Sequence, residues 1–289
     1  MSGPAPLALP ALVLGSIAIG ASPIFVRWSE LGPVATAFHR VLWALPLLWL
    51  WQGIEARRTA APVAGRRMLW LAGLLFAGDL TLWHLSILNT TVANATLFAN
   101  FAPVVVTLGA WLVLRERIER RFVLGLGLCM AGAAALIGSS IELKAEYVRG
   151  DIYGVITAGF FGSYLVAVKA LRERGHAPGR IMLWSGMVTC GALLALTLAV
   201  GETLWPETWL GLAVLIGLAW TSQVGGQGLI AYGVGHLPAS FTSLVILIEP
   251  LTAAVLGWWL LGEALGALQF LGGAAILAGI LVARQNGTS

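Results

Sequence analysis

Ten long apolar stretches recur along this chain, and each can cross a lipid bilayer as a helix. A membrane-spanning helix needs about 20 mostly apolar residues. Stretches of this kind lie at 7–27, 33–52, 68–88, 91–114, 121–138, 150–171, 180–200, 209–231, 238–261 and 266–283. Transmembrane β-strands are excluded, because they need only about 9–11 residues of alternating polarity. The sequence therefore predicts an all-α integral membrane protein with ten transmembrane helices.

The composition agrees with a membrane protein. Hydrophobic residues make up 58% of the chain and charged residues only 10%, against roughly 25% charged residues in soluble domains. The net charge of +4 does not indicate nucleic-acid binding, because the basic residues form short runs between apolar stretches. Cys129 and Cys190 lie inside apolar stretches and are expected to pack in the core. We expect a bilayer and a small-molecule substrate as partners, no nucleic acid, no cofactor and no metal, in a monomer or homodimer.

The distribution of positive charge predicts the orientation. Thirteen basic residues follow the second, fourth, sixth and tenth stretches. They are Arg57, Arg58, Arg66, Arg67, Arg115, Arg117, Arg120, Arg121, Lys169, Arg172, Arg174, Arg180 and Arg284. The opposite side carries Arg27, Lys144 and Arg149. Because cytoplasmic loops are enriched in Lys and Arg, we expect a multi-pass bacterial inner-membrane protein with both termini in the cytoplasm.

The two halves of the sequence repeat one another. At a shift of 147 residues, as between Pro103 and Pro250, stretches four and five align with stretches nine and ten without a gap. The aligned identities include Trp111 with Trp258, Glu116 with Glu263, Gly125 with Gly272 and Gly132 with Gly279. Runs of apolar residues match by chance at Leu and Ala, but rarely at Pro, Trp, Glu and Gly together. The chain therefore consists of two related halves.

Each half contains five helices, so the two halves run in opposite directions through the membrane. We place the first repeat at 1–140 and the second at 141–289. The charges agree, since an Arg-rich turn follows stretch four while its counterpart, 262–266, has no basic residue. Inverted repeats are typical of carriers that rock around a substrate site near the bilayer midplane.

The repeated spacing of Pro, Glu and two Gly also carries a resemblance. The pattern Pro103-Glu116-Gly125-Gly132 recurs as Pro250-Glu263-Gly272-Gly279. It resembles the end of each half in the EamA-type carriers of the drug/metabolite transporter superfamily. This resemblance implies their ten-helix fold, a peripheral position for the fifth and tenth helices, and transport of a small metabolite. It implies no particular substrate, because the family handles amino acids, cations, nucleobases, sugars and vitamins. The chain departs from plainer members at Ser22-Pro23, which should break the first helix.

Ionisable residues within the spans are the first candidates for function, because they are costly in a bilayer. Asp79 lies mid-helix in 68–88, and Glu249 directly precedes Pro250, which should loosen the helix near Ile246. Each acid is interpreted as a substrate contact or proton carrier. The alternatives are a structural partner of Arg40 for Asp79, and a backbone or histidine partner for Glu249.

Arg40 distinguishes the two acids. It is interpreted as structural, and it lies nearer in the sequence to the helix of Asp79, which it should stabilise as an anion. Glu249 is therefore the preferred proton carrier. Pro103 and Pro250 are interpreted as structural or gating residues.

Amides and aromatic residues complete the predicted site. Trp220, Gln223 and Gln227 share one helical face at spacings of three and four. The full set of predicted substrate contacts is Asp79, Trp83, Asn94, Phe98, Phe101, Tyr164, Trp220, Gln223, Gln227 and Glu249. Such a set suits a flat or cationic organic solute, although aromatic residues at helical spacing more often serve packing. We expect the first, third, fourth, sixth, eighth and ninth helices to surround the cavity.

These features favour a secondary active carrier over an enzyme or a channel. The sequence has no nucleotide-phosphate loop, zinc-protease motif or Gly-x-Ser-x-Gly, and no selectivity-filter sequence. Arg40 is the one cation deep in a span, so a neutral, zwitterionic or cationic solute such as an amino acid or amine is favoured over an anion. Within the carrier class, a vitamin, nucleobase or sugar-like solute is the alternative.

The orientation can be measured with reporter fusions. A reporter joined after Ser289 should be active when it requires the cytoplasm and silent when it requires the periplasm, because the thirteen-to-three basic bias places the C-terminus inside. Periplasmic activity would contradict both the helix count and the orientation.

Overall fold

The computed structural model describes residues 7–57, 65–90, 92–138, 144–261 and 266–284. Within these ranges the chain forms helices joined by turns and no strand. Nine helical stretches of at least 18 residues are apolar enough to span a membrane, and a tenth, α15 (Ala267–Ala283), has 17 residues. The predicted all-α, ten-helix architecture is confirmed.

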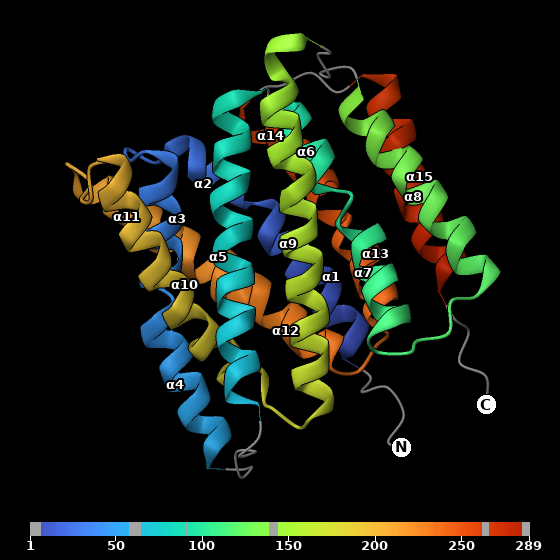
Figure 1. Cartoon of the computed structure of the whole chain (residues 1–289). Coiled ribbons are helices and arrows are strands. Elements are labelled where there is room, and N and C mark those ends of the chain that lie inside the picture. The colour runs from blue at the N-terminus through green and yellow to red at the C-terminus, as the bar shows by residue number, and fades with distance from the viewer. Residues whose placement is uncertain (1–6, 58–64, 91, 139–143, 262–265, 285–289) are drawn as a thin grey trace.

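Several of the ten spans are built from more than one helix (Figure 1). The first half contains α1 (Ala8–Gly20), α2 (Ser22–Trp28), α3 (Pro33–Leu42), α4 (Leu45–Ala56), α5 (Arg66–Asn89), α6 (Val92–Ala99), α7 (Ala102–Leu112) and α8 (Arg120–Gly138). The second half contains the short η1 (Ala145–Tyr147), α9 (Val148–Glu173), α10 (Pro178–Val200), α11 (Trp209–Leu218), η2 (Ala219–Gln227), α12 (Gly228–Val234), α13 (Ala239–Ile246), α14 (Ile248–Leu261) and α15.

Proline accounts for four interruptions within spans. A new helix begins shortly before Pro23, Pro46, Pro103 and Pro250, so that each proline lies in the first turn. A proline is tolerated there because the N–H that it lacks would have had no partner within the helix. The breaks before Pro23 and near Ile246 agree with the sequence prediction. Those before Pro46 and Pro103 were not predicted.

The eighth span contains a π-helix in its middle. Between α11 and α12, the segment η2 has π-helical geometry, which is rare and found mostly at functional sites. A Cβ added at Gly15 of α1 would lie 2.9 Å from the Gly226 carbonyl oxygen of η2. The missing side chains therefore allow α1 and η2 to pack with their backbones in near contact, which brings the π-helix to the centre of the molecule.

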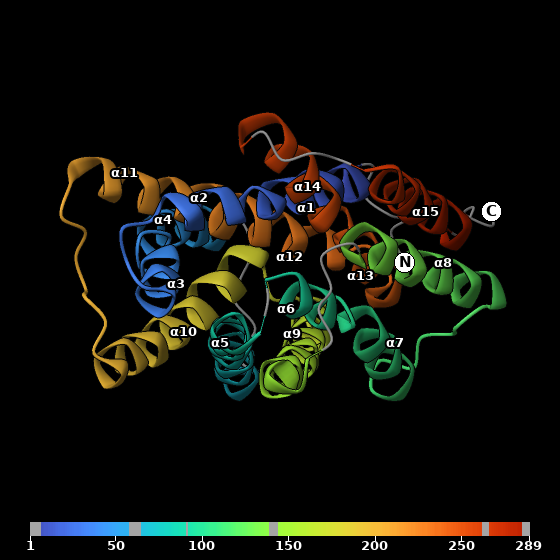
Figure 2. The same cartoon turned by 90° about the horizontal axis from the view of Figure 1, so that it is seen from above.

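The fifth and tenth spans pack on each other at one edge of the molecule (Figure 2). A Cβ on Gly132 of α8 would lie 2.6 Å from the Gly272 carbonyl oxygen, and one on Gly125 would lie 2.6 Å from that of Gly279. These are the glycines paired by the repeat, so the two helices cross at equivalent positions. The crossing confirms that these glycines let the helices approach closely.

Two glutamates related by the repeat each lie against a helix start of the opposite half. Oε2 of Glu202, which follows α10, accepts a hydrogen bond of 2.7 Å from the Ala35 N–H in the first turn of α3. Glu55, 147 positions earlier, lies near the end of α4 with its carboxylate against Gly179 in the first turn of α10. The first N–H groups of a helix lack partners within it and attract negative charge. Each half thus supplies an acid to a helix start of the other.

Two more glutamates join the halves in the same way. Glu116, after α7, accepts hydrogen bonds from the Ala239 N–H at 2.7 Å and the Ser240 hydroxyl at 2.8 Å, at the start of α13. Glu30, after α2, accepts from the Glu207 and Thr208 N–H groups at 2.9 and 3.1 Å, directly before α11. In Figure 1 the start of α11 lies at the upper end of the bundle and the turn between α7 and α8 at the lower end.

The Glu30 contact makes stability depend on pH. Hydrogen bonds from the Thr208 hydroxyl and N–H hold the pKa of the Glu30 carboxyl below its ordinary value of 4.5. A lowered pKa stabilises the fold above the ordinary value, and this contribution is lost as the pH falls through the folded value. Glu30→Gln should therefore lower the melting temperature in detergent at neutral pH, and its difference from wild type should shrink below pH 4.5.

The matched control for this experiment is Glu207→Gln. This residue is exposed on the same surface and contributes its backbone N–H, not its side chain, to the contact. It should melt like the wild-type protein throughout. A Glu30→Gln defect of constant size at all pH values would contradict the assignment.

Candidate substrate cavity

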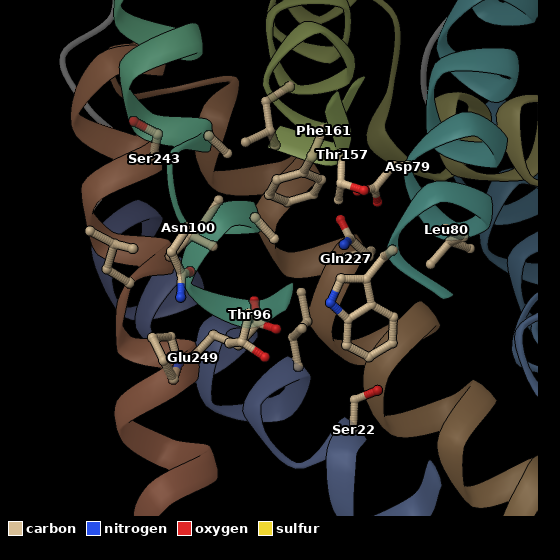
Figure 3. A pocket seen from close by; sticks show the side chains of 18 of the residues that line it. Ser22, Asp79, Leu80, Thr96, Asn100, Thr157, Phe161, Gln227, Ser243 and Glu249 are labelled. Atoms are coloured by element: carbon tan, nitrogen blue, oxygen red, sulfur yellow. The ribbon is translucent and has the colours of Figure 1, made fainter. Parts of the chain in front are cut away.

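A cavity of about 130 Å³ lies at the centre of the bundle, where interrupted helices from both halves meet (Figure 3). Its wall comes from α1, α2, α3, α5, α6, α7, α9, η2, α13 and α14. The six spans predicted to surround the cavity all contribute to it, and α3 adds the second span through Arg40. No residue of α8 or α15 in the described part of the chain lines the cavity.

Three ionisable side chains from three helices face this cavity. Asp79 of α5 and Glu249 of α14 line it together with Arg40 of α3. Asp79 and Arg40 are each only 8% exposed. Arg40 is thus the one cation among the three ionisable side chains that line the described part of the cavity. Arg40 therefore balances the charge of one carboxylate, and the two acids leave the cavity with an excess negative charge when both are ionised.

Neutral groups hold the Arg40 guanidinium in place. Its Nε donates to Gln223 Oε1 of η2 at 3.3 Å, and Nη1 donates to Ser22 Oγ of α2 at 3.4 Å. Among the described residues, no ion pair within 4.0 Å joins Arg40 to an acid. The expected pairing of Arg40 with Asp79 is therefore wrong as a direct contact, because the guanidinium is directed toward Gln223 and Ser22 instead.

Three polar atoms in the cavity wall have no hydrogen-bond partner among the residues that the structure describes. They are Gln227 Oε1, Asn100 Nδ2 and Thr157 Oγ1, all buried. A buried polar group without a partner costs about 1–3 kcal/mol, so native proteins rarely retain one without a reason. The cavity wall thus offers one acceptor, one donor and one hydroxyl. A bound polar solute would require groups of these kinds as its hydrogen-bond partners.

The polar side chains form two groups across the cavity. Figure 3 shows Asp79, Thr157 and Gln227 converging on one side, from α5, α9 and η2. Glu249 and Thr96 lie near each other on the other side, from α14 and α6. Each group contains one acid beside uncharged hydrogen-bonding groups. A solute between them meets a carboxylate at both ends.

Several residues chosen from the sequence line this cavity. They are Asp79, Trp83, Gln227 and Glu249 among the predicted substrate contacts, and Arg40, Pro103 and Pro250 among the predicted structural or gating residues. Both Gln223 and Gln227 face the protein interior, with exposures of 1% and 3%. The predicted cavity required these two glutamines to face inward and not toward lipid, and their burial agrees with that requirement.

Two predicted contacts lie behind the cavity wall. Gln223 does not line the cavity and instead holds Arg40. Tyr164 is 1% exposed, stacks on Phe76 with ring centroids 4.8 Å apart, and its hydroxyl donates to Met182 Sδ. Phe76 lines the cavity, so Tyr164 supports the wall from behind. The prediction of direct contact is wrong for both, because neighbouring side chains stand between them and the cavity.

Three predicted aromatic contacts lie outside the cavity. Phe98 and Phe101 stack on each other with centroids 6.3 Å apart, and Phe101 is 40% exposed. Trp220 is 53% exposed and donates to the Trp43 carbonyl oxygen at 3.3 Å. These three predictions are corrected, since the rings pack at the periphery. The side chain of Asn94 lies outside the described residues.

Asn100 was not predicted as a substrate contact and yet lines the cavity. The sequence prediction assumed one continuous helix over 91–114, on which Asn100 points away from the face of Asn94, Phe98 and Phe101. The chain instead leaves α6 at Ala99 and resumes as α7 at Ala102, which changes the direction of the side chains between them. Pro103 and its repeat partner Pro250 were the available signal for this break. Thr157, also missed, gave no signal of its own.

Comparison with known proteins agrees with this architecture. The profile of the EamA-like transporter family matches the chain twice, over residues 6–138 and 148–285. The chain belongs to the EamA-like transporter family. The two matches correspond to the two halves identified from the repeat, and the resemblance noted in the sequence is confirmed.

Relatives of this EamA-like transporter include named transporters. An uncharacterized transporter of Archaeoglobus fulgidus is 29% identical over 277 residues, covering 94% of each chain. The uncharacterized transporter YwfM of Bacillus subtilis is 27% identical over 236 residues, covering 81% of this chain and 77% of its own. The pseudopaline exporter CntI of Pseudomonas aeruginosa is 26% identical over 235 residues, covering 80% and 78%. A solved crystal structure, 17% identical, superposes with a TM-score of 0.77 over 96% of each chain and shares the fold.

The two glutamines of η2 provide a test of the site. Gln223→Leu leaves the Arg40 Nε without its acceptor and should destabilise the unliganded transporter by roughly 1–3 kcal/mol. Gln227→Leu removes an oxygen that has no partner among the described residues and should cost distinctly less. Thermal unfolding of the two variants in one detergent measures the difference. Equal losses of stability would contradict the different roles assigned to the two glutamines.

Proposed function

We propose that this protein is a secondary active carrier for a small neutral, zwitterionic or cationic organic solute, such as an amino acid or amine, and that it works by alternating access across the bacterial inner membrane. The observation that carries the proposal is the set of unpartnered buried polar atoms beside two acids in the described part of the central cavity. The inverted halves and the membership of a transporter family support it.

The charges in the cavity favour a solute that carries an amine. Two carboxylates and one guanidinium line the space, and two of the five guanidinium N–H groups donate to neutral partners. An anion would meet two acids and a single cation. An ammonium group compensates the excess negative charge, and opposite charges attract strongly where water is excluded.

The uncharged groups favour a solute with hydrogen bonds of both kinds. Gln227 Oε1 accepts, Asn100 Nδ2 donates and the Thr157 hydroxyl can do either. A zwitterion provides ammonium donors and carboxylate acceptors within one small molecule. A vitamin, nucleobase or sugar-like solute also provides both kinds and is the alternative within the class. A thermal-shift screen across these classes separates them, because a ligand that binds only the folded state raises its apparent stability.

A channel or an intramembrane enzyme is the alternative from another class. The relatives are named as transporters, which favours transport over catalysis. Flux into proteoliposomes that reaches a maximum as the solute concentration rises would support a carrier. Flux that rises in proportion to the solute concentration would support a channel. Chemical change of the solute during the assay would support an enzyme.

Asp79 is the stronger candidate for a proton carrier. From the sequence this role fell to Glu249, on the assumption that Arg40 lies beside Asp79. In the structure the Arg40 guanidinium donates to Gln223 and Ser22, so within the described residues no direct ion pair with Arg40 holds Asp79 as an anion. Protonated Asp79 would also be a hydrogen-bond donor, and the unpartnered Gln227 oxygen converges on it in Figure 3. Hydrogen bonding to the neutral form favours proton uptake.

Transport at different pH values tests this assignment. Asp79→Asn keeps a neutral side chain of the same shape and should flatten the dependence of transport on pH between about 5.5 and about 8. Glu249→Gln should keep the wild-type profile but weaken apparent affinity for a cationic solute, because it removes one attractive charge. The measurement is uptake into proteoliposomes, with melting temperature as the control for folding. A flat profile for Glu249→Gln with a normal profile for Asp79→Asn would reverse the assignment.

We further propose the topology that the charge bias predicts. In this arrangement the first repeat spans 1–140, the second spans 141–289, and both termini are cytoplasmic. The N-terminal end of α1 and the C-terminal end of α15 lie on the same side of the bundle in Figure 1. The turns after α7 and α9, which carry basic residues, lie on that side as well.

A further inference from the structure

A second hollow lies far from the central cavity, at the turn between α7 and α8. It has a volume of about 480 Å³ and is lined by Trp111, Arg115, Glu116, Arg117 and Ile118. None of these residues lines the central cavity. The turn lies at the lower surface in Figure 1, which is the surface where the basic residues concentrate.

Arg115 occupies a backbone conformation that favours glycine. Its φ of 57° makes it the one non-glycine residue in the described part of the chain with a positive φ. Helices commonly end on a left-handed residue, usually glycine, because side chains are strained there. The repeat partner of Arg115, 147 positions on, is Gly262. In the repeat alignment Arg115 thus stands opposite a glycine, the residue type that a positive φ favours.

The two guanidinium groups at this turn are available to a ligand. Arg115 and Arg117 are exposed, and within the described ranges neither side chain makes a hydrogen bond or an ion pair. The nearby Arg121 differs, since it pairs with Glu119 at 2.7 Å. Glu116 lies between the two arginines but directs its carboxylate to Ala239 and Ser240. The hollow is therefore bordered by two arginines that are available to a ligand, while its one acid, Glu116, already accepts hydrogen bonds from α13.

The surface beside the hollow is apolar. Trp111, Leu112 and Val113 are 58%, 65% and 64% exposed, on a helix that spans the membrane. Tryptophan at a span end is typical of the membrane interface. A ligand that fits both features carries negative charge at the interface and hydrocarbon below it, which is the chemistry of an anionic phospholipid rather than of free phosphate.

We propose that this hollow binds the headgroup phosphate of an anionic phospholipid, with Arg115 and Arg117 as its cationic contacts and Trp111 beside its acyl chains. Arginine matches phosphate geometry through paired N–H donors. The same turn holds Glu116, which joins the two halves at the start of α13. Occupancy by lipid therefore fixes the turn and strengthens the contact between the halves, independently of any transported solute.

The test compares two pairs of arginines with equal charge on the same surface. The double variant Arg115→Gly and Arg117→Ala removes both cationic side chains from the hollow. Glycine at position 115 also suits the positive φ of the backbone there. Arg66→Ala with Arg67→Ala removes two exposed arginines at the start of α5. Each protein is placed in phosphatidylcholine nanodiscs with increasing phosphatidylglycerol. Melting temperature is measured, and lipids retained by the detergent-purified proteins are counted by native mass spectrometry.

Phosphatidylglycerol should raise the melting temperature of the wild-type protein and of the Arg66/Arg67 variant, because a ligand that binds the folded state stabilises it. The Arg115/Arg117 variant should lose most of that rise and one retained lipid, while still melting cooperatively in phosphatidylcholine. Equal losses in both variants would show diffuse attraction and overturn the proposal. A similar rise with inorganic phosphate alone would assign the hollow to free phosphate and overturn it as well.

Discussion

Inside a bilayer every backbone N–H and C=O must find its partner within the protein, and the central site depends on how this chain meets that demand. Continuous helices satisfy it automatically, whereas interrupted helices leave backbone groups free. The breaks between α6 and α7 and between α13 and α14 occur at positions related by the repeat, and both adjoin the cavity. Irregular backbone is tolerated at this depth where it lines a cavity or is buried in protein. The repeated prolines therefore fix where the helices are interrupted, and the position of the central cavity depends on them.

A second constraint is the buried cation. A guanidinium in this environment is costly unless its donors are satisfied, and pairing it tightly with a carboxylate would neutralise both groups. The chain instead gives Arg40 two neutral acceptors, Gln223 and Ser22. This arrangement keeps both Asp79 and Glu249 in contact with the cavity. Two glutamines of one π-helix thus have different surroundings, since Gln223 holds Arg40 while Gln227 lines the cavity.

Local patterns in the sequence predicted much of the fold. Prediction failed where tertiary packing decides which way a side chain points or which partner it contacts. Apolar length predicted the ten spans, proline predicted the break near Ile246, and polarity within a span identified Asp79, Gln227 and Glu249. Face assignments failed along 94–101, because they assumed one continuous helix where the chain breaks after Ala99. Arg40 was assigned by closeness in sequence to Asp79, whereas its acceptor Gln223 is 183 positions away. The contact of Glu202 with α3 spans 167 positions, and no local pattern indicates such a pairing.

The glutamate contacts between the halves bear on how an alternating-access cycle is balanced. In the proposed cycle, opening toward one surface would break contacts such as those of Glu30 and Glu202, and opening toward the other would break that of Glu116. At both surfaces the contact is a carboxylate that accepts from backbone N–H groups at or next to a helix start, so the two openings would break contacts of the same kind. Restraints of the same kind at both surfaces would keep the inward-open and outward-open states of the proposed cycle close in free energy. A solute or proton can then shift the populations, since a ligand shifts an equilibrium only by its difference in affinity for the two states. The inverted repeat thus bears on the proposed cycle as well as on the fold, because Glu55 and Glu202, 147 positions apart, each lie against a helix start of the opposite half.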